Sequence, residues 1–353
     1  MRIVVVCGGV SSERSVSMSS GLTVTKALIA AHHDVVVLDP AQQPSVLIGG
    51  SGSGTDHLFD LEIQAELPGS GVGRCGASFL DSLMAPDVWD QLRGADIVFV
   101  ALHGGWGEDG HVQALFEMAG IPFTGASSVA CNFSYRKSRS LQLLKAAGVP
   151  TPEHVVWESQ VRSVPADAIA MVNRGPVVVK PDTEGSSVGA HLVDNAVQIE
   201  SIKNNTADLV IGPYLPGREF TVGVIGDTVL PPVEINNIRA LFDYQSKYRR
   251  EVSCQCPAPV DDALNERLKK YALSAHQALA FDSTMYSRID FRCDADENPF
   301  VLEVNALPGL SPVSLLPLAA MQLGWSYLEL IESLINLKLS SIRRCRSVSA
   351  SSG

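Results

Sequence analysis

The segment from Arg288 to Asn305 is the most informative part of the sequence and reads Arg-Ile-Asp-Phe-Arg-Cys-Asp-Ala-Asp-Glu-Asn-Pro-Phe-Val-Leu-Glu-Val-Asn. Two runs in which apolar and polar residues alternate flank a polar turn, Asp294 to Pro299. This pattern is typical of a β-hairpin, because successive side chains of a strand point to opposite faces of the sheet. We therefore expect two antiparallel strands with their polar residues on one face.

The polar face of this hairpin would bring four functional side chains together. If the hairpin closes symmetrically about residues 296 and 297, Asp290 lies opposite Glu303 and Arg288 lies opposite Asn305. Two carboxylates directly across a strand pair repel each other, so the arrangement needs a compensating cation. Oxygen ligands from Asp, Glu and Asn suit Mg2+ that also binds phosphate oxygens. Arg288 suits an oxyanion, and the alternative is a solvated face without a ligand.

Composition excludes several classes of protein. The chain has 353 residues, 46% hydrophobic and 18% charged, so we expect a globular protein of two or three domains. A net charge of −11 argues against nucleic-acid binding. The sequence contains no run of about 18 apolar residues, so we expect no membrane-spanning helix. Seven cysteines without a CxxC pair predict neither a disulfide framework nor a zinc site. We expect reduced thiols in the cytoplasm.

Two glycine-rich loops follow predicted strands in the N-terminal part. Ile3 to Val6 is expected to be a buried parallel strand, followed by a glycine turn that opens a helix near Glu13. Glu13 could either complement the helix dipole or hold a cationic amine. Ile97 to Leu102 is expected to end in the loop from His103 to Gly110, where four glycines surround a His, a Glu and an Asp. Such a loop at the carboxyl end of a strand favours a ligand-binding role.

A lysine and a second flexible loop follow further along the chain. We expect a helix over Tyr135 to Ala147, ended by the turn residues Gly148 to Pro152. The predicted strand Pro176 to Pro181 carries Lys180, and the Gly/Ser loop Asp182 to Gly189 can surround a phosphate with backbone N–H groups and hydroxyls. This combination predicts a nucleoside triphosphate under a lid. The alternative is a polar hairpin loop.

The C-terminal part begins with a predicted hairpin, Glu219 to Ile225 and Thr228 to Val233, which is joined by Gly226 and Asp227. An amphipathic helix is expected over Asp262 to Ala280. Two further helices near 314–323 and 326–339 should close the fold, followed by a frayed tail.

Taken together, these stretches resemble the D-alanine–D-alanine ligase family of the ATP-grasp superfamily. The resemblance covers most of the chain but leaves residues 41–95 without a motif. Its eight motifs, in order, are Gly8 to Ser17, Ala101 to Gly110, Pro122 to Gly125, Val179 to Pro181 with Glu184 to Gly189, Arg218 to Val222, Phe242 to Tyr248, Arg288 to Asp290 and Leu302 to Asn305.

The resemblance implies an α/β, three-domain ATP-grasp fold with an N-terminal Rossmann-like open parallel sheet. The expected domains are an N-terminal substrate domain over 1–134, a central lid domain over 135–215 and a C-terminal domain with the metal and catalytic site over 216–340. Residues 341–353 are expected to be a disordered tail. The resemblance also implies a homodimer.

The implied activity is the joining of two D-alanine molecules for peptidoglycan synthesis. ATP would phosphorylate the carboxylate of the first D-alanine, and the amine of the second would attack the acyl phosphate. The implied cofactors are ATP and two Mg2+ ions, with Mn2+ as the alternative ion. Since the metals neutralise phosphoryl charge and the site aligns two reactants, catalysis would depend mainly on positioning and electrostatics.

The resemblance also implies a role for each candidate residue. The residues expected to bind ATP are Lys137, Lys180, Glu184 and Ser187 near the phosphates and Glu219 at the ribose. Asp290, Glu303 and Asn305 would bind the two metal ions. Around the substrates, Glu13 would bind the first amine with His103 nearby, and Arg288 and the Gly309 N–H would stabilise the tetrahedral oxyanion. Lys247 and Ser314 would bind the carboxylate of the second substrate. Ser186 and Tyr248 would join Glu13 in closing the lid.

Three departures from the family pattern lie close to the expected ligands. Gly212-Pro213 stands where the family usually has Glu-Lys, Tyr135-Arg136 where it has Met-Asp, and Ala306 to Ser311 where it has Thr-x-Pro-Gly-x-Thr. These departures keep a second interpretation open, a ligase that joins D-alanine to D-serine or another amino acid in a biosynthetic or resistance pathway. A third interpretation, a non-catalytic nucleotide-binding regulator, would require loss of the metal-binding residues, and all three are present.

Overall fold

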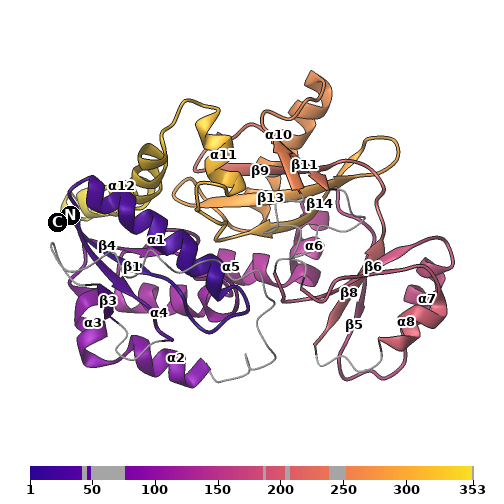
Figure 1. Ribbon diagram of the computed structural model, residues 1–353, viewed down its shortest axis with the longest axis horizontal. Helices are drawn as coiled ribbons and strands as arrows, with labels where there is room; N and C mark the ends of the chain where they lie inside the picture. The colour runs from indigo at the N-terminus through magenta and orange to yellow at the C-terminus, as the bar shows by residue number, and fades with distance from the viewer. Residues whose placement is uncertain (42–45, 49–75, 186–187, 203–206, 238–251, 352–353) are drawn as a thin grey trace.

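The computed structural model describes residues 1–41, 46–48, 76–185, 188–202, 207–237 and 252–351 of the chain. Three sheets, each with its own helices, organise this mixed α/β fold, as the sequence predicted (Figure 1). None of the described helices combines the length and the apolar content needed to cross a membrane.

The N-terminal sheet has the strand order β3-β2-β1-β4. Its strands β1 (Arg2–Val6), β2 (Asp34–Leu38) and β4 (Ile97–Val100) are parallel, and β3 (Val46–Ile48) is antiparallel at the edge. The first three strands are rich in valine and buried, which is typical of parallel strands covered on both faces. The predicted open parallel sheet is therefore confirmed for these strands.

Helices cover both faces of this sheet. Ile3 and Val5 of β1 face one hydrophobic cluster, and Val4 and Val6 face the other. The first cluster includes α1 (Arg14–Ala30) and α12 (Tyr327–Ser351), and the second includes α2 (Gly76–Leu83), α3 (Pro86–Arg93) and α4 (His111–Ala119). The carboxyl ends of β1 and β4 therefore stay uncovered by helices, and the two glycine-rich loops begin there.

The second sheet is antiparallel, in the order β5-β8-β6-β7. Its strands are β5 (Val155–Trp157), β8 (Leu209–Pro213), β6 (Val177–Pro181) and β7 (His191–Val193). Val177 and Val179 pack against α7 (Ala166–Val172) and α8 (Ala196–Ser201). Strand alternation therefore turns Val178 and Lys180 to the other face, where both line a pocket.

The third sheet contains the predicted hairpin of residues 288–305. Its order is β12-β11-β9-β13-β14, and β10 pairs with β9. The strands are β9 (Glu219–Ile225), β10 (Thr228–Val229), β11 (Val233–Asn237), β12 (Val252–Gln255), β13 (Tyr286–Cys293) and β14 (Pro299–Asn305). The predicted second strand of the first hairpin ends early, because Pro231 and Pro232 separate β10 from β11 and cannot donate to a ladder.

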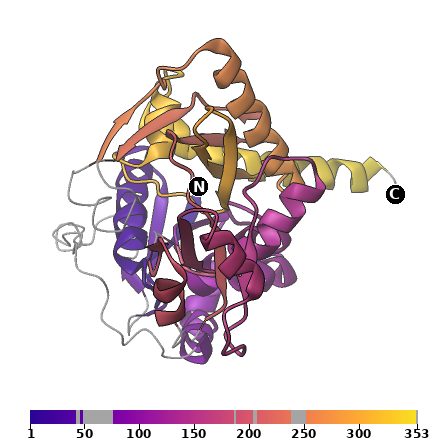
Figure 2. The ribbon, with the colours of Figure 1, turned by 90° about the vertical axis from the view of Figure 1, so that its right-hand side faces the viewer.

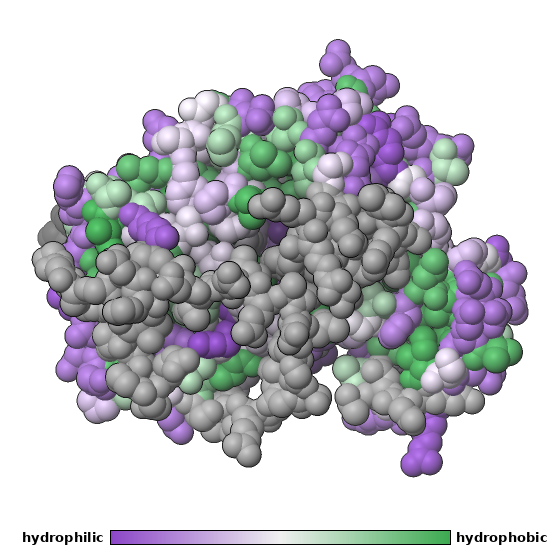
Figure 3. Space-filling model, in the orientation of Figure 1, coloured by the Kyte–Doolittle hydropathy of each residue, from purple (hydrophilic) through white to green (hydrophobic). Residues whose placement is uncertain are grey.

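The apolar face of this sheet packs against α5 (Ser128–Tyr135), α6 (Lys137–Ala146) and α10 (Asp262–Ala278). The Asp261 side chain caps α10 by accepting the Leu264 N–H at 2.7 Å. The buried side of α10 includes Leu264 and Leu268, while its outer side is hydrophilic (Figure 3). On the opposite face of β9, α11 (Leu315–Met321) packs where Gly223 leaves room, since a Cβ there would lie 2.4 Å from Leu316 Cδ1.

The predicted register of the hairpin is confirmed where it matters for the site. Arg288 pairs with Asn305 and Asp290 pairs with Glu303. Nearer the turn the symmetric closure is wrong, because Phe291 pairs with Val301 and Leu302 is the extra residue of a β-bulge.

Two predicted helix limits are also wrong. The helix expected over Tyr135 to Ala147 begins at Lys137, because the backbone of Arg136 is extended. Asp182 caps this helix: its carbonyl oxygen accepts the Lys137 N–H at 3.0 Å, and its Oδ1 accepts the Ser138 N–H at 2.7 Å. The tail expected to fray after residue 340 continues α12 to Ser351, and Figure 2 shows the end of this helix extending from the body of the molecule. No glycine or proline interrupts α12 over its length.

Candidate functional site

Two pockets meet at the polar face of the hairpin. The hinge pocket lies between the second sheet and the hairpin, and its polar lining includes Lys137, Lys180, Glu184, Glu219, Asp290 and Glu303. The central pocket has a volume of about 460 Å³, and its polar lining includes Glu13, His103, Glu108, Arg288, Asn305, Gly309 and Ser314. Lys137, Glu184 and Glu303 line both pockets, so these side chains form the wall between them.

Asp290 is the centre of the hydrogen bonding on the hairpin face. Arg288 donates to it twice, from Nε to Oδ1 at 2.9 Å and from Nη2 to Oδ2 at 2.7 Å. Thr221 Oγ1 on β9 donates to Oδ1 at 2.6 Å, and Asn305 Nδ2 donates to Oδ2 at 3.0 Å. Burial opposes the charge of Arg288, but Asp290 and Glu303 outweigh burial and raise its pKa. The guanidinium is therefore held as a fixed cation at the edge of the central pocket.

Glu303 and Asn305 supply the oxygen atoms that face outward from the hairpin. Neither the Glu303 carboxylate nor Asn305 Oδ1 forms a hydrogen bond with any residue that the structure describes. Within the same part of the chain, no three His, Cys, Asp or Glu side chains gather into a complete protein metal site. Two carboxylates and one amide oxygen do fit Mg2+, which usually takes one or two carboxylates and completes its ligands with phosphate and water.

Two lysines place positive charge beside these oxygens. Lys180 is half-buried, and its desolvation lowers its pKa; Glu303 counteracts this effect and Lys137 adds to it. The Lys137 ammonium donates to the Glu184 carbonyl oxygen. Two neighbouring lysines repel each other unless an anion lies between them, so this end of the hinge pocket fits a polyphosphate.

The far end of the hinge pocket is apolar with a polar rim. Leu141, Val178 and Val210 are among its apolar lining residues. At the rim, Arg292 donates from Nη1 to Glu219 Oε2 at 3.1 Å and from Nε to the Leu215 carbonyl oxygen at 2.8 Å. An apolar slot with a few fixed polar groups is suited to a planar base and its sugar.

The glycine-rich loops hold Glu13 and His103 at the central pocket. The N–H groups of Gly8 and Gly9 donate to Ser17 Oγ at 2.8 Å and to Asp39 Oδ1 at 3.0 Å, so they are occupied within the fold. Both glycines have positive φ values, 80° and 78°, which side chains other than glycine rarely adopt. The tight turn therefore serves to place Glu13 at the start of α1 and not to bind a phosphate through these N–H groups.

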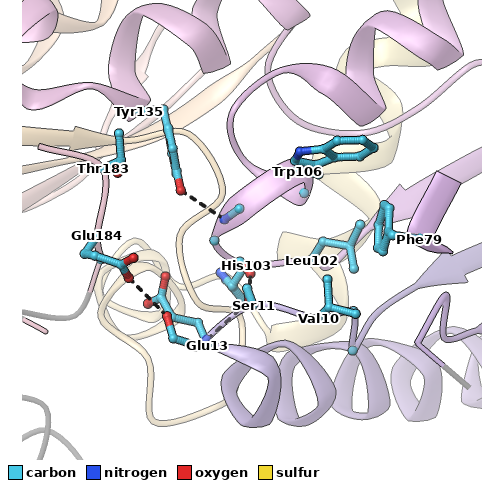
Figure 4. Close-up of a pocket in the computed structure, with 17 residues that line it drawn as sticks. Val10, Ser11, Glu13, Phe79, Leu102, His103, Trp106, Tyr135, Thr183 and Glu184 are labelled. Atoms are coloured by element: carbon cyan, nitrogen blue, oxygen red, sulfur yellow. Dashed lines mark hydrogen bonds between the residues drawn. The ribbon is translucent and has the colours of Figure 1, made fainter. Parts of the chain in front are cut away.

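Figure 4 shows an adjoining pocket, which shares Glu13, His103, Tyr135 and Glu184 with the central pocket. Glu13 and Glu184 lie close together, and Ser12 Oγ donates to Glu184 Oε2 at 3.3 Å. The His103 carbonyl oxygen accepts from Ser11 Oγ, and His103 Nε2 lies 3.2 Å from Ser20 Oγ. Two carboxylates at one mouth give this side of the site a negative charge that suits a substrate ammonium.

Glu108 is a half-buried carboxylate in the central pocket. Its Oε2 accepts the Gly104 N–H at 3.0 Å, which closes the loop around the short 3-10 helix η2 (Gly105–Gly107). Burial, followed by the charge of Glu13, raises the pKa of Glu108 to about 7. Glu108 is therefore the carboxylate of this pocket that changes charge near neutral pH.

The structure brings most of the predicted site residues together. Those that line one or both pockets are Glu13, His103, Lys137, Lys180, Glu184, Glu219, Arg288, Asp290, Glu303, Asn305, Gly309 and Ser314. Ser186, Ser187, Lys247 and Tyr248 lie outside the described residues. Sequence reasoning did not assign roles to Ser20, Glu108, Thr221 and Arg292; the loop that follows β4 pointed to Glu108, and the alternation of β9 after Glu219 pointed to Thr221.

Comparison with known proteins identifies the family. Residues 2–126 match the family model described as D-ala D-ala ligase N-terminus, and residues 143–336 match D-ala D-ala ligase C-terminus. The D-alanine–D-alanine ligase of Synechococcus sp. (strain JA-2-3B'a(2-13)) is 33% identical over 365 residues, covering 100% of this chain and 99% of the relative. The enzyme of that name from Nitrosomonas europaea is 33% identical over 343 residues, covering 95% of this chain and 96% of the relative.

The fold agrees with these sequence matches. The crystal structure of D-alanine–D-alanine ligase from Bacillus anthracis complexed with ATP superposes with a TM-score of 0.74 and 25% identity, covering 98% of this chain and 99% of that chain. Both halves of the sequence, the order of the sheets and the residues of the two pockets thus lead to one conclusion. The chain belongs to the D-alanine–D-alanine ligase family.

Proposed function

We propose that this protein joins two D-alanine molecules into D-alanyl-D-alanine, using ATP and an acyl-phosphate intermediate, for peptidoglycan synthesis. The observation that carries the proposal is the shared wall of Lys137, Glu184 and Glu303 between the hinge pocket and the central pocket. A nucleotide in the hinge pocket would place its terminal phosphate at this wall. A carboxylate in the central pocket would then be in line to attack it.

The hinge pocket supports ATP as the phosphate donor. Its apolar slot would hold the adenine, and Glu219 would bind the ribose hydroxyls. Lys137, Lys180 and Glu184 would lie along the phosphates, as the charge of the two lysines requires. Catalysis would then consist of aligning the reactants and stabilising the charge of the transferring group.

The hairpin face supports a divalent cation as the partner of ATP. Asp290, Glu303 and Asn305 would hold two Mg2+ ions, with Mn2+ as the alternative, through carboxylate and amide oxygens. When bound, these ions supply neutralisation of the phosphoryl charge. Thr221 and Arg288 keep the Asp290 carboxylate oriented toward the pocket side of the sheet.

The central pocket supports two amino-acid substrates. Glu13 would bind the ammonium of the first D-alanine beside His103, and Ser314 would bind the carboxylate of the second. The amine of the second molecule attacks the acyl carbon, the tetrahedral intermediate places its negative charge between Arg288 and the Gly309 N–H, and phosphate leaves. The roles of Ser186, Ser187, Lys247 and Tyr248 stay predictions from the family resemblance.

We also propose the three domains at 1–134, 135–215 and 216–340 and a cytoplasmic homodimer. Each proposed domain contains one of the three sheets. The location follows from the need for ATP.

The test measures phosphate release from ATP with Mg2+ and D-alanine alone, with detection of the product by mass spectrometry. Mixtures of D-alanine with D-serine, D-lactate and L-amino acids run in parallel. D-alanyl-D-alanine as the main product is the expected result. Product from a mixture but none from D-alanine alone would overturn the proposed substrate pair and assign the protein to the D-alanine–D-X ligases.

A further inference from the structure

We infer that Ser20 and Glu108 are positioning residues that hold the loop Ala306 to Leu310 so that the Gly309 N–H faces the reacting carbon. The inference rests on the proposed function, because it concerns how the oxyanion donor of that reaction is held. Ser20 lines neither of the two pockets, and Glu108 lines the central pocket beside Leu307. Both belong to the N-terminal part of the chain, whereas the loop follows β14 in the third sheet.

Glu108 holds the loop on the amino-terminal side of Gly309. Its Oε2 accepts the Gly104 N–H at 3.0 Å, and the Leu307 N–H lies near enough to the same carboxylate to lower its pKa. Glu108 therefore lies between the loop that carries His103 and the loop that carries Gly309. Leu307 itself is 3% exposed, and its side chain fills the space left by Gly125, where a Cβ would lie 2.9 Å from Leu307 Cδ2.

Ser20 holds the loop on the other side. It is fully buried in α1, and its Oγ accepts the Leu310 N–H at 3.2 Å. Ser20 Oγ also lies 3.2 Å from His103 Nε2, within hydrogen-bond distance of the imidazole. Leu310 is held further by the Tyr327 hydroxyl, which donates to its carbonyl oxygen at 2.7 Å.

Gly309 lies between these two attachments and opens into the central pocket. Its N–H forms no hydrogen bond within the described part of the chain, unlike the N–H group of Leu310. The loop has no helix or strand of its own to fix its backbone. The direction of the Gly309 N–H therefore depends on the side chains that hold its neighbours.

Positioning of this kind has a specific energetic signature. A fixed donor stabilises the tetrahedral intermediate without reorganisation during the reaction, while a displaced donor loses that advantage. Ground-state ligands gain much less from the same N–H. Loss of Ser20 or Glu108 should thus weaken binding of a tetrahedral mimic more than binding of the product or of a nucleotide.

The experiment compares wild type with Ser20→Ala and Glu108→Gln in the full-length protein. Thr25→Val is the matched control for Ser20, because it removes another fully buried hydroxyl of α1, one that bonds only within the helix to the Gly21 carbonyl oxygen at 2.8 Å. Glu117→Gln is the control for Glu108, because Glu117 also accepts a backbone N–H, that of Ser128 at 2.9 Å, but lines neither pocket.

Two readouts separate positioning from general damage to the fold. Calorimetric titration gives Kd values for a phosphinate mimic of the tetrahedral intermediate, for D-alanyl-D-alanine and for ADP with Mg2+. Steady-state kinetics give kcat and the KM for ATP. We expect Ser20→Ala and Glu108→Gln to weaken phosphinate binding and lower kcat by about 10- to 100-fold, with changes below about 3-fold for ADP, dipeptide and the KM for ATP.

Equal changes for the phosphinate and the dipeptide, or no change for either, would overturn the inference. Effects of the same size in Thr25→Val or Glu117→Gln would also overturn it, because they would show a general loss of packing. A wild-type protein that makes no D-alanyl-D-alanine would remove the proposed function and this inference together. An active wild type with unselective variants would remove only the inference.

Discussion

Replacing Glu108 by glutamine should change how the stability of the protein depends on pH. Glu108 is half-buried beside Glu13, and desolvation followed by the charge of Glu13 raises its pKa from 4.5 to about 7. Below pH 4.5 the carboxyl is protonated in both the folded and the unfolded chain. Between pH 4.5 and 7 the unfolded chain has released the proton and the folded chain still holds it, so the free energy of unfolding falls as the pH rises.

The size of this effect follows from the same two values. The interval from 4.5 to about 7, at about 1.4 kcal/mol for each pH unit, corresponds to about 3 kcal/mol. Glutamine does not titrate, so Glu108→Gln lacks this dependence. The free energy of unfolding of the variant minus that of wild type should therefore increase by about 3 kcal/mol between pH 4.5 and 7.5, whatever constant offset the changed hydrogen bonds add.

Urea denaturation without ligands, at four pH values from 4.5 to 7.5, measures this difference. Circular dichroism and tryptophan fluorescence should follow the transition together, because Trp106 lies in the same loop as Glu108. Glu158→Gln is the control, since it makes the same chemical change at an exposed position. A difference between Glu108→Gln and wild type that stays constant over this pH range would refute the assigned burial of Glu108 and its proximity to Glu13.

Three further predictions concern the metal site and the packing. Glu303→Gln should lower turnover by about 1000-fold while changing the calorimetric Kd for ATP far less, and near-normal activity would remove the metal assignment. Gly21→Ala should lower the free energy of unfolding, measured in urea, by about 1 to 2 kcal/mol. The new Cβ would lie 2.3 Å from Cys7 Cβ, and this overlap outweighs the gain of about 1 kcal/mol in helix propensity. Increased stability of the variant would contradict this packing. Arg218→Ala should lower the free energy of unfolding by about 2 kcal/mol in the same assay, since it leaves the buried Glu234 without its bidentate partner at 2.7 and 3.0 Å. A decrease below about 0.5 kcal/mol would show that this ion pair contributes as little as one on the surface.

The hairpin shows which parts of a fold can be predicted from its sequence. Alternation between Arg288 and Asp290 and between Glu303 and Asn305 fixed their common face, because a strand repeats every two residues. The bulge at Leu302 could not be predicted from the alternation of apolar and polar residues, since the residues on either side of it still alternate. The register at the site was therefore predictable and the geometry of the turn was not.

Contacts between distant residues account for the other differences. The bend at Arg136 depends on Asp182, which caps α6 from another part of the chain, so no local propensity reveals it. The glycine-rich loops carry Glu13 and His103 to the central pocket, and their binding of a ligand stays a prediction. Their N–H groups, however, are used within the fold, and only the tertiary structure shows that Ser20 bonds to both His103 and Leu310.

The bidentate pair of Arg288 and Asp290 reduces the net negative charge on the hairpin face. The sequence placed two carboxylates across from each other and required a cation between them, and a metal ion was the expected choice. In the folded chain Arg288 already acts as an internal counter-ion for one of the two. We therefore expect the sheet to assemble in a medium depleted of divalent ions. If the proposed Mg2+ ions bind at this face, a chelator should stop the reaction without unfolding the protein.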